Sequence, residues 1–218
     1  MNIDLLAGGA DPAGSLRLAL LVTLIALAPA FMAMVTSFTR IIVVLYFLRS
    51  ALGTQQIPPN QVLLGLALFL TVFSMGPTLK EVNERSLQPF SKGQITSALA
   101  IQRAEAPMRD FMFKHADDRD LGLFVRLAKL PRPKTRADVP TTVLIPAFII
   151  GELKTAFEIG FLIYIPFLVI DLVVASTLMS MGMFMLPPVL LSLPFKILLF
   201  ILIDGWHLLA ESLVRSFG

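Results

Sequence analysis

The sequence predicts an all-α, membrane-associated chain made of two helical hairpins with kinked or broken helices and a small helical insertion between them. Of the 218 residues, 56% are hydrophobic and only 15% are charged, against about 25% in ordinary soluble proteins. Long apolar runs lie on both sides of a single polar window. These features indicate an integral membrane protein or part of a membrane-bound assembly.

Composition also argues against several classes of site. The chain has no cysteine, so it has neither disulfides nor thiolate ligands. His115 and His207 are its two histidines, too few for a histidine-based zinc cage. We therefore expect no metal, no cofactor and no catalytic residues. The formal charge of +3 is small, and we expect no nucleic-acid partner.

Shifts in composition divide the chain into four segments. Residues 1–15 form a Gly-, Asp- and Pro-containing tail, 16–78 the first helical hairpin, 79–142 a polar helical segment, and 143–218 the second helical hairpin. Each hairpin contains an apolar segment, a Pro-Pro turn and another apolar segment, with the turns at Pro58-Pro59 and Pro187-Pro188.

The first apolar run, from Leu16 to Phe38, is long enough to cross a bilayer, which takes about 20 residues. Pro29 is expected to kink it. The run continues past Arg40 to Arg49, so Arg40 lies where a charge is costly unless it is paired or faces a protein or aqueous interior.

The first turn contains Pro58-Pro59, which should end the preceding helix. Asn60 is expected to cap the next helix. The following run, Val62 to Pro77, is barely long enough to span. Positive-inside counting places Arg40 and Arg49 on the cytoplasmic side and the long polar segment outside.

The polar window from Lys80 to Asp138 holds twelve Lys or Arg and eight Asp or Glu, which is 20 of the chain's 33 charges. It should face water as two or three short amphipathic helices, one of them capped by Asp117 or Asp118. An apolar stripe ends at His115, which we interpret as a boundary residue of a packed helix. Because the charges are mixed in sign, a solvated face is favoured over a binding patch.

The second hairpin carries four charges in about 30 residues of an apolar region: Glu152, Lys154, Glu158 and Asp171. Such charges are acceptable between subunits or around a water-filled path. Lys154 and Glu158 are one helical turn apart and can pair, whereas Glu152 and Asp171 need partners from elsewhere. We expect neighbouring copies to supply the missing partners, which predicts a ring-forming subunit.

The last apolar region, Val189 to Val214, contains Lys196, Asp204, Trp206 and His207. Trp206 suits a membrane interface, and Asp204 shares a helix face with His207.

The methionine stretch, residues 178–188, holds four of the chain's ten methionines at alternate positions, Met179, Met181, Met183 and Met185. In an extended segment all four side chains would point the same way, and Gly182 with Pro187-Pro188 favours an extended or bent backbone. Flexible thioethers make a deformable apolar surface, suited to closing around objects of varying shape. The alternative is that methionine fills gaps in an ordinary apolar helix.

Four blocks of sequence together resemble the FliP family of flagellar biosynthetic proteins and its relatives in type III secretion. The first block runs through Thr36 to Leu45, Phe47 to Arg49, Ala51 to Gln56 and Pro58 to Thr71, the second through Glu152 to Phe157 and Ile165 to Leu172, the third is the methionine stretch, and the fourth comprises Leu193 to Lys196 and Asp204 to Trp206. Thr39-Arg40 and Gly53 to Gln56 resemble the flagellar branch more than the injectisome branch. The chain departs from the family at Gly151, where a small hydroxyl residue usually precedes the Glu.

The resemblance implies a core subunit of the flagellar protein-export gate in the bacterial inner membrane and basal body, with a periplasm-facing portion. It implies a homo-oligomer of five copies that assembles with FliQ and FliR and with other export-apparatus membrane proteins. Unfolded flagellar substrates would pass through it. The family's assembled core rides largely above the membrane plane, so hydropathy overstates how much of the chain spans lipid.

By resemblance, Met181, Met183, Phe184 and Met185 would form a constriction ring, with Gly182, Pro187 and Pro188 as its hinge. A ring of flexible apolar side chains dewets when empty and yields to a threaded chain. Six residues would pack subunits together or carry buried charge: Arg40, Glu152, Lys154, Asp171, Lys196 and Asp204.

Other functions stay open at this point. An injectisome paralogue would share most of these motifs, and a small-solute transporter or channel would also have broken helices and midplane charges. An intramembrane aspartyl protease would use Asp171 and Asp204 as a carboxylate pair. Neither residue follows a glycine, as the aspartates of such enzymes typically do, which disfavours this alternative.

Overall fold

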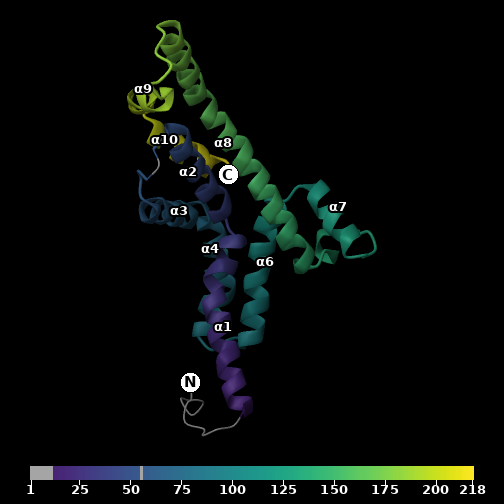
Figure 1. Cartoon of the computed structure of the whole chain (residues 1–218). Coiled ribbons are helices and arrows are strands. Elements are labelled where there is room, and N and C mark those ends of the chain that lie inside the picture. The colour runs from purple at the N-terminus through teal and green to yellow at the C-terminus, as the bar shows by residue number, and fades with distance from the viewer. Residues whose placement is uncertain (1–11, 55) are drawn as a thin grey trace.

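A computed structural model describes residues 12–54 and 56–218, and within these ranges the chain is all-helical with no strand (Figure 1). In chain order the elements are α1 (Pro12–Met34), α2 (Phe38–Leu52), α3 (Asn60–Ser74), α4 (Gly76–Val82), the π-helical turn η2 (Asn83–Leu87), α5 (Gln88–Ser91), α6 (Ser97–His115), α7 (Asp118–Leu127), the 3-10 turn η3 (Arg136–Asp138), α8 (Thr141–Ser180), α9 (Pro188–Leu202) and α10 (Gly205–Arg215). The all-α prediction is confirmed.

The molecule is branched, and its centre is the crossing of α2 with the long helix α8 (Figure 1). The end of α8 and the start of α9 project at one extremity, α1 projects at the opposite one, and α7 lies to the side. At 40 residues, α8 is about 60 Å long at 1.5 Å per residue.

The core forms where α2 packs against α8. Ile41, Val44, Leu45 and Leu48 are buried on α2, and their i, i+3, i+4, i+7 spacing produces a single apolar stripe. Each such side chain contributes about 1.5 to 3 kcal/mol when fully buried. Gly160 on α8 allows close approach, because a Cβ there would lie only 2.5 Å from the Phe47 ring.

The first long apolar run is two helices rather than one continuous helix. Pro29 lies inside α1, but the helix ends five residues later, at Met34, and α2 begins at Phe38. In the break, the Thr36 hydroxyl donates to the Ala33 carbonyl and accepts from the Phe38 amide. Such side-chain bonds compete with helical backbone bonds, which explains why the chain turns here instead of at the proline.

The turn at Pro58-Pro59 is present, but the predicted cap is wrong. Asn60 is the first residue of α3 and Pro59 is the cap position. The Asn60 side-chain oxygen accepts instead from Arg49, at 2.6 Å. The guanidinium therefore takes the acceptor that would otherwise have capped the helix.

The polar segment folds as the predicted amphipathic helices. Asp117 caps α7 by accepting from the Arg119 amide at 2.9 Å. The predicted stripe on α6 is confirmed as well, because Phe111 and Met112 are buried in the core. Phe111 packs edge-on against Phe148 of α8, with ring centroids 5.8 Å apart.

The described helices fit a membrane-associated chain. By length and composition α8 alone could cross a membrane, and two bent pairs, α3 with Gly76–Ser91 and α9 with α10, each turn through 64° at their break. Helix α8 runs through Pro146 and Pro166 without interruption. That the run from Leu16 to Phe38 crosses a bilayer stays a prediction.

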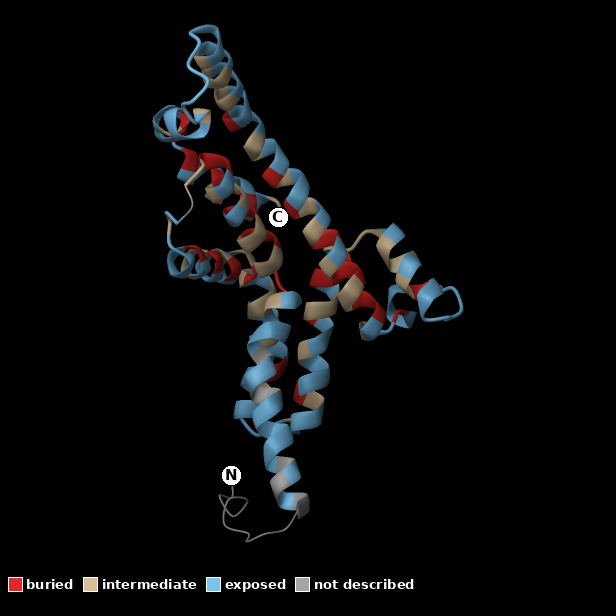
Figure 2. Ribbon diagram, viewed as in Figure 1, coloured by how far each residue is buried: buried red, intermediate tan, exposed pale blue. Residues whose placement is uncertain are grey.

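Large apolar side chains are exposed over much of the surface. Figure 2 shows buried positions concentrated on α2 and the adjoining half of α8, with exposed positions dominating the far end of α8 and α9. Exposed residues there include Leu172, Val173, Leu190 and Leu202. Contiguous apolar surface of this kind is covered by lipid or by other chains in a working protein.

Candidate functional site

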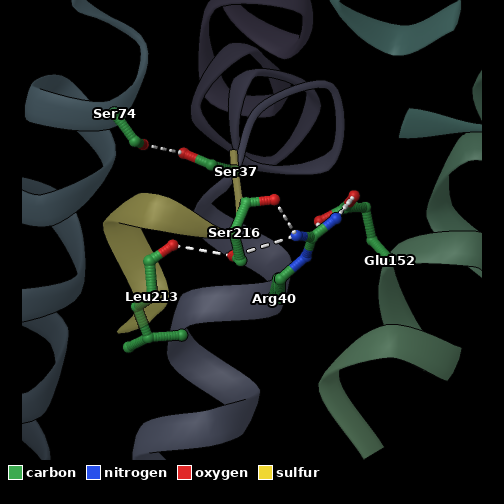
Figure 3. Close-up of polar contacts among 6 residues, drawn as sticks. All are labelled: Ser37, Arg40, Ser74, Glu152, Leu213 and Ser216. Carbon is green, nitrogen blue, oxygen red and sulfur yellow. Dashed lines mark hydrogen bonds and ion pairs between the residues drawn. The ribbon is translucent and has the colours of Figure 1, made fainter. Parts of the chain in front are cut away.

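A buried ion pair joins the two hairpins. Arg40 on α2 meets Glu152 on α8, with Nε to Oε2 at 2.9 Å and Nη2 to Oε1 at 2.5 Å (Figure 3). Both side chains are almost completely buried. Two parallel bonds between a guanidinium and a carboxylate are the strongest common form of side-chain pairing. The pair therefore fixes how α2 sits against α8.

The C-terminal residues complete the surroundings of Arg40. Its Nη1 donates to the Ser216 carbonyl at 2.9 Å and to the Ser216 hydroxyl at 3.0 Å (Figure 3). The guanidinium also lies over the Phe217 ring, 4.0 Å from its centroid. Beside it, the Ser37 and Ser74 hydroxyls are 2.6 Å apart and join α2 to α3. One arginine thus ties three distant segments together.

His115 lies against the same cluster. Its ring packs on Phe111 and Phe217, with centroid distances of 4.8 and 5.3 Å. Burial, followed by the positive charges of Arg40 and Lys114, lowers the pKa of His115 from 6.5 to about 4. The imidazole is accordingly neutral at physiological pH, and the prediction that it is a boundary residue of a packed helix is confirmed.

A second charge pair links α8 to α9. Lys196 is buried and its Nζ donates to Asp171 at 2.6 Å and to the Ala51 carbonyl at 3.2 Å. Ser192, one turn earlier on α9, donates to the other Asp171 oxygen at 2.5 Å. Because Ala51 lies in the last turn of α2, the lysine also interacts favourably with the negative end of that helix.

These contacts correct the expected pairing of the charges. Glu152 and Asp171 do find partners elsewhere in the sequence, but those partners belong to the same chain, so the premise that neighbouring copies must neutralise them is wrong. Lys154 does not pair with Glu158. It is exposed, and its Nζ lies 3.5 Å from Asp117, because α7 approaches this face of α8.

Asp204 is also not a buried charge in this chain. It is exposed at the junction of α9 and α10, where its φ of 51° lies in the left-handed region. Asp171 is bound by a lysine and a serine instead of a second carboxylate. This arrangement does not support the protease alternative.

The sequence patterns did not identify three residues that contact these charge pairs: Ser192, Ser216 and Phe217. Ser192 lies four residues before Lys196 on one helix face, so its spacing could have indicated it. Ser216 and Phe217 carry no such signal, because their partners lie far away in the sequence.

The methionine stretch forms the tip of the α8–α9 hairpin, at the top of Figure 1. Its backbone is a turn: Met179 is helical, Met181 is the first residue after α8, and Gly182 has a φ of 75°. The later residues up to Pro187 are non-helical. Of the extended and bent forms that the sequence leaves open, the bent one is present.

The tip is apolar, exposed and held only at its base. Four methionines and Phe184 are exposed on it, and Met185 is 98% exposed. Met181 lies ten residues beyond Asp171, which is about 15 Å along a helix. The Asp171 contacts therefore brace the hairpin at some distance from the tip and leave the tip side chains without a packed core.

Taken together, the fold and these contacts define a helical, membrane-associated chain whose internal charge pairs support a projecting apolar tip. The chain belongs to the FliP family, whose model matches residues 21–213.

Several characterised relatives are similar over nearly the whole chain. The flagellar biosynthetic protein FliP of Bacillus subtilis is 55% identical over 203 residues, covering 93% of this chain and 92% of that protein. FliP of Pectobacterium carotovorum is 53% identical, covering 96% and 81%, and FliP of Caulobacter vibrioides is 52% identical, covering 100% and 82%. The chain is accordingly a member of a family of flagellar biosynthetic proteins.

Proposed function

We propose that this chain is a core subunit of the flagellar export gate and that the methionine stretch closes the conduit. The observation that carries the proposal is the exposed apolar tip, about 15 Å beyond the last charge pair of its hairpin. Met181, Met183, Phe184 and Met185 form the constriction, and Gly182, Pro187 and Pro188 form its hinge. Unfolded flagellar proteins pass through the ring and displace these flexible side chains.

The alternative in which methionine fills gaps in a helix core is disfavoured. A gap-filling side chain is enclosed by neighbours, whereas Met181 and Met185 are exposed. Exposed apolar side chains gain nothing by burial within this chain. Their free energy falls only when another copy, a partner or a transported segment covers them.

We infer a homo-oligomer of five copies, with FliQ and FliR as further subunits and other export-apparatus membrane proteins nearby. The apolar faces of α3, α8 and α9 supply surface for those contacts or for lipid. Arg40, Glu152, Asp171 and Lys196 act within each copy and hold these faces in register. Lys154 and Asp204, which are exposed, remain candidates for contacts between copies.

The proposed location is the bacterial inner membrane within the flagellar basal body, with the polar segment 79–142 facing the periplasm. The chain lacks cysteine, so a Lys134→Cys variant has a single thiol at an exposed site. It should react with an impermeant thiol reagent added from the periplasmic side. Labelling from the cytoplasmic side alone would reverse this orientation.

The gate is tested by replacing Met181, Met183 and Met185 together with alanine. The variant should assemble at normal levels and conduct small ions, because the ring loses the apolar volume that excludes water. A matched control replaces the exposed Met32 and Met34 of α1, which lie outside the tip, and should not leak. An assembled tip variant with unchanged conductance, or one that fails to assemble, contradicts the proposal.

A further inference from the structure

Methionine exposure is distributed unevenly over the described residues. Met181 and Met185 are 68% and 98% exposed at the tip, whereas Met75 and Met112 in the core are 1% and 2% exposed. Met179 and Met183 are exposed as well. Within one chain, four exposed thioethers therefore lie within seven residues of one turn.

Accessible thioethers react with peroxides. A sulfur lone pair attacks one oxygen of hydrogen peroxide, an S–O bond forms as the O–O bond breaks, and water leaves. The sulfur loses two electrons to give the sulfoxide, and the peroxide gains them. The sulfoxide is polar and is reduced again by methionine sulfoxide reductases.

Met32 and Met34 of α1 are also exposed, at 55% and 46%, and should react as well. The tip differs from them because it gathers four exposed thioethers in one turn. Gly182 adopts a left-handed conformation, and a Cβ at this position would meet no atom within 4 Å beyond its chain neighbours, so the turn is open around its centre. Phe184 is exposed as well. Core thioethers at Met75 and Met112 are enclosed on all sides and exclude the oxidant.

We propose that the methionine stretch is a site of reversible thioether oxidation by peroxide, and that sulfoxides at Met181 and Met185 weaken closure of the tip. The second half of the proposal rests on the proposed gate function. A sulfoxide oxygen accepts hydrogen bonds from water, so an oxidised ring stays hydrated where a thioether ring dewets. Oxidation would thus raise ion leakage without a change in fold.

The site itself is tested by treating the purified, assembled complex with dilute hydrogen peroxide and measuring the sulfoxide at each methionine by mass spectrometry. Met181 and Met185 should oxidise about tenfold faster than Met75 and Met112, since reaction follows access to the sulfur. Tip methionines that oxidise no faster than the two core residues overturn the proposal.

The consequence is tested by conductance, with each sample compared with its own untreated state. Peroxide should raise the conductance of the native complex, and methionine sulfoxide reductase should restore it. In a variant with leucine at Met181, Met183 and Met185, peroxide should produce no such change, because leucine has no sulfur to oxidise. A native complex that is oxidised at the tip but shows no change in conductance contradicts the gate function while leaving the oxidation site intact. An equal rise in the leucine variant places the sensitive group elsewhere and overturns the second half of the proposal.

Discussion

Removing Arg40 should destabilise the chain far more than removing an ordinary surface arginine. In an Arg40→Ala variant the Glu152 carboxylate stays buried without its partner, which typically costs about 3 to 5 kcal/mol. The Ser216 carbonyl and hydroxyl also lose their donor, at about 0.5 to 1.5 kcal/mol for each bond. We therefore expect a loss of at least about 4 kcal/mol in the free energy of unfolding.

The measurement is a titration of the purified chain with a denaturing detergent, followed by the helical circular-dichroism signal. Arg215→Ala is the matched control, because Arg215 pairs with Glu211 at 2.7 Å on the surface, where the two side chains are 79% and 39% exposed. That exposed pair should contribute less than about 1 kcal/mol.

A double variant separates the charge pair from the packing. Arg40→Met with Glu152→Leu removes both charges while keeping apolar volume, and such exchanges of buried pairs are often neutral or stabilising. The double variant should therefore be more stable than Arg40→Ala. The reasoning is refuted if Arg40→Ala costs no more than Arg215→Ala, or if the double variant is the less stable of the two.

Three further predictions concern neighbouring contacts. Lys196→Met should leave Asp171 without its cation and loosen the base of the tip hairpin. Hydrogen exchange would then show faster exchange of the α9 amides. Unchanged protection of these amides would contradict a bracing role for Lys196. Gly151→Ser should stabilise the chain by about 1 kcal/mol more than Gly151→Ala, because the serine hydroxyl can donate a hydrogen bond to Asp120 Oδ2. This buried oxygen lies 3.9 Å from a Cβ at residue 151 and has no hydrogen-bond partner among the described residues. Equal stability of the two variants would count against that hydrogen bond. Because the pKa of His115 is about 4 when folded against 6.5 for the free side chain, its neutral form contributes stability above pH 6.5 that is lost as the pH falls toward 4. Unfolding titrations across that window should show the decline, and His115→Phe should reduce it; an unchanged slope would exclude His115 as its source.

Local sequence patterns predicted much of this fold because they depend on a few adjacent residues. The buried stripe on α6, the cap at Asp117 and the bend at Gly182 each follow from short-range spacing or backbone freedom. The cap predicted at Asn60 failed because Arg49, eleven residues earlier, takes its oxygen. A local preference was overridden by a contact across the turn.

The charge partners could not be predicted in the same way. A lone buried carboxylate such as Glu152 requires a cation, but the sequence does not indicate which one, because Arg40 is 112 residues away. For Lys154 the candidate one helical turn away, Glu158, was the wrong one. The partner is set by how α7 and α2 pack against α8, which is a property of the whole fold.

The four-segment division at residues 15, 78 and 142 stays a prediction, as do the roles of the tip residues. The structure supports the tip proposal through exposure and geometry within one chain. Its central claim concerns several chains, namely that their tips meet around one axis.

That claim is tested most directly by crosslinking through Met185. Since the chain has no cysteine, Met185→Cys introduces one thiol per copy, and tips that meet around an axis bring these thiols within reach of a short bifunctional thiol crosslinker. The same substitution at the exposed Lys134, on the polar segment away from the tip, is the control. We predict that the assembled Met185→Cys complex gives linked dimers, the largest product that one thiol per chain allows, while the Lys134→Cys complex does not. An intact complex whose Met185→Cys chains remain single would contradict the account.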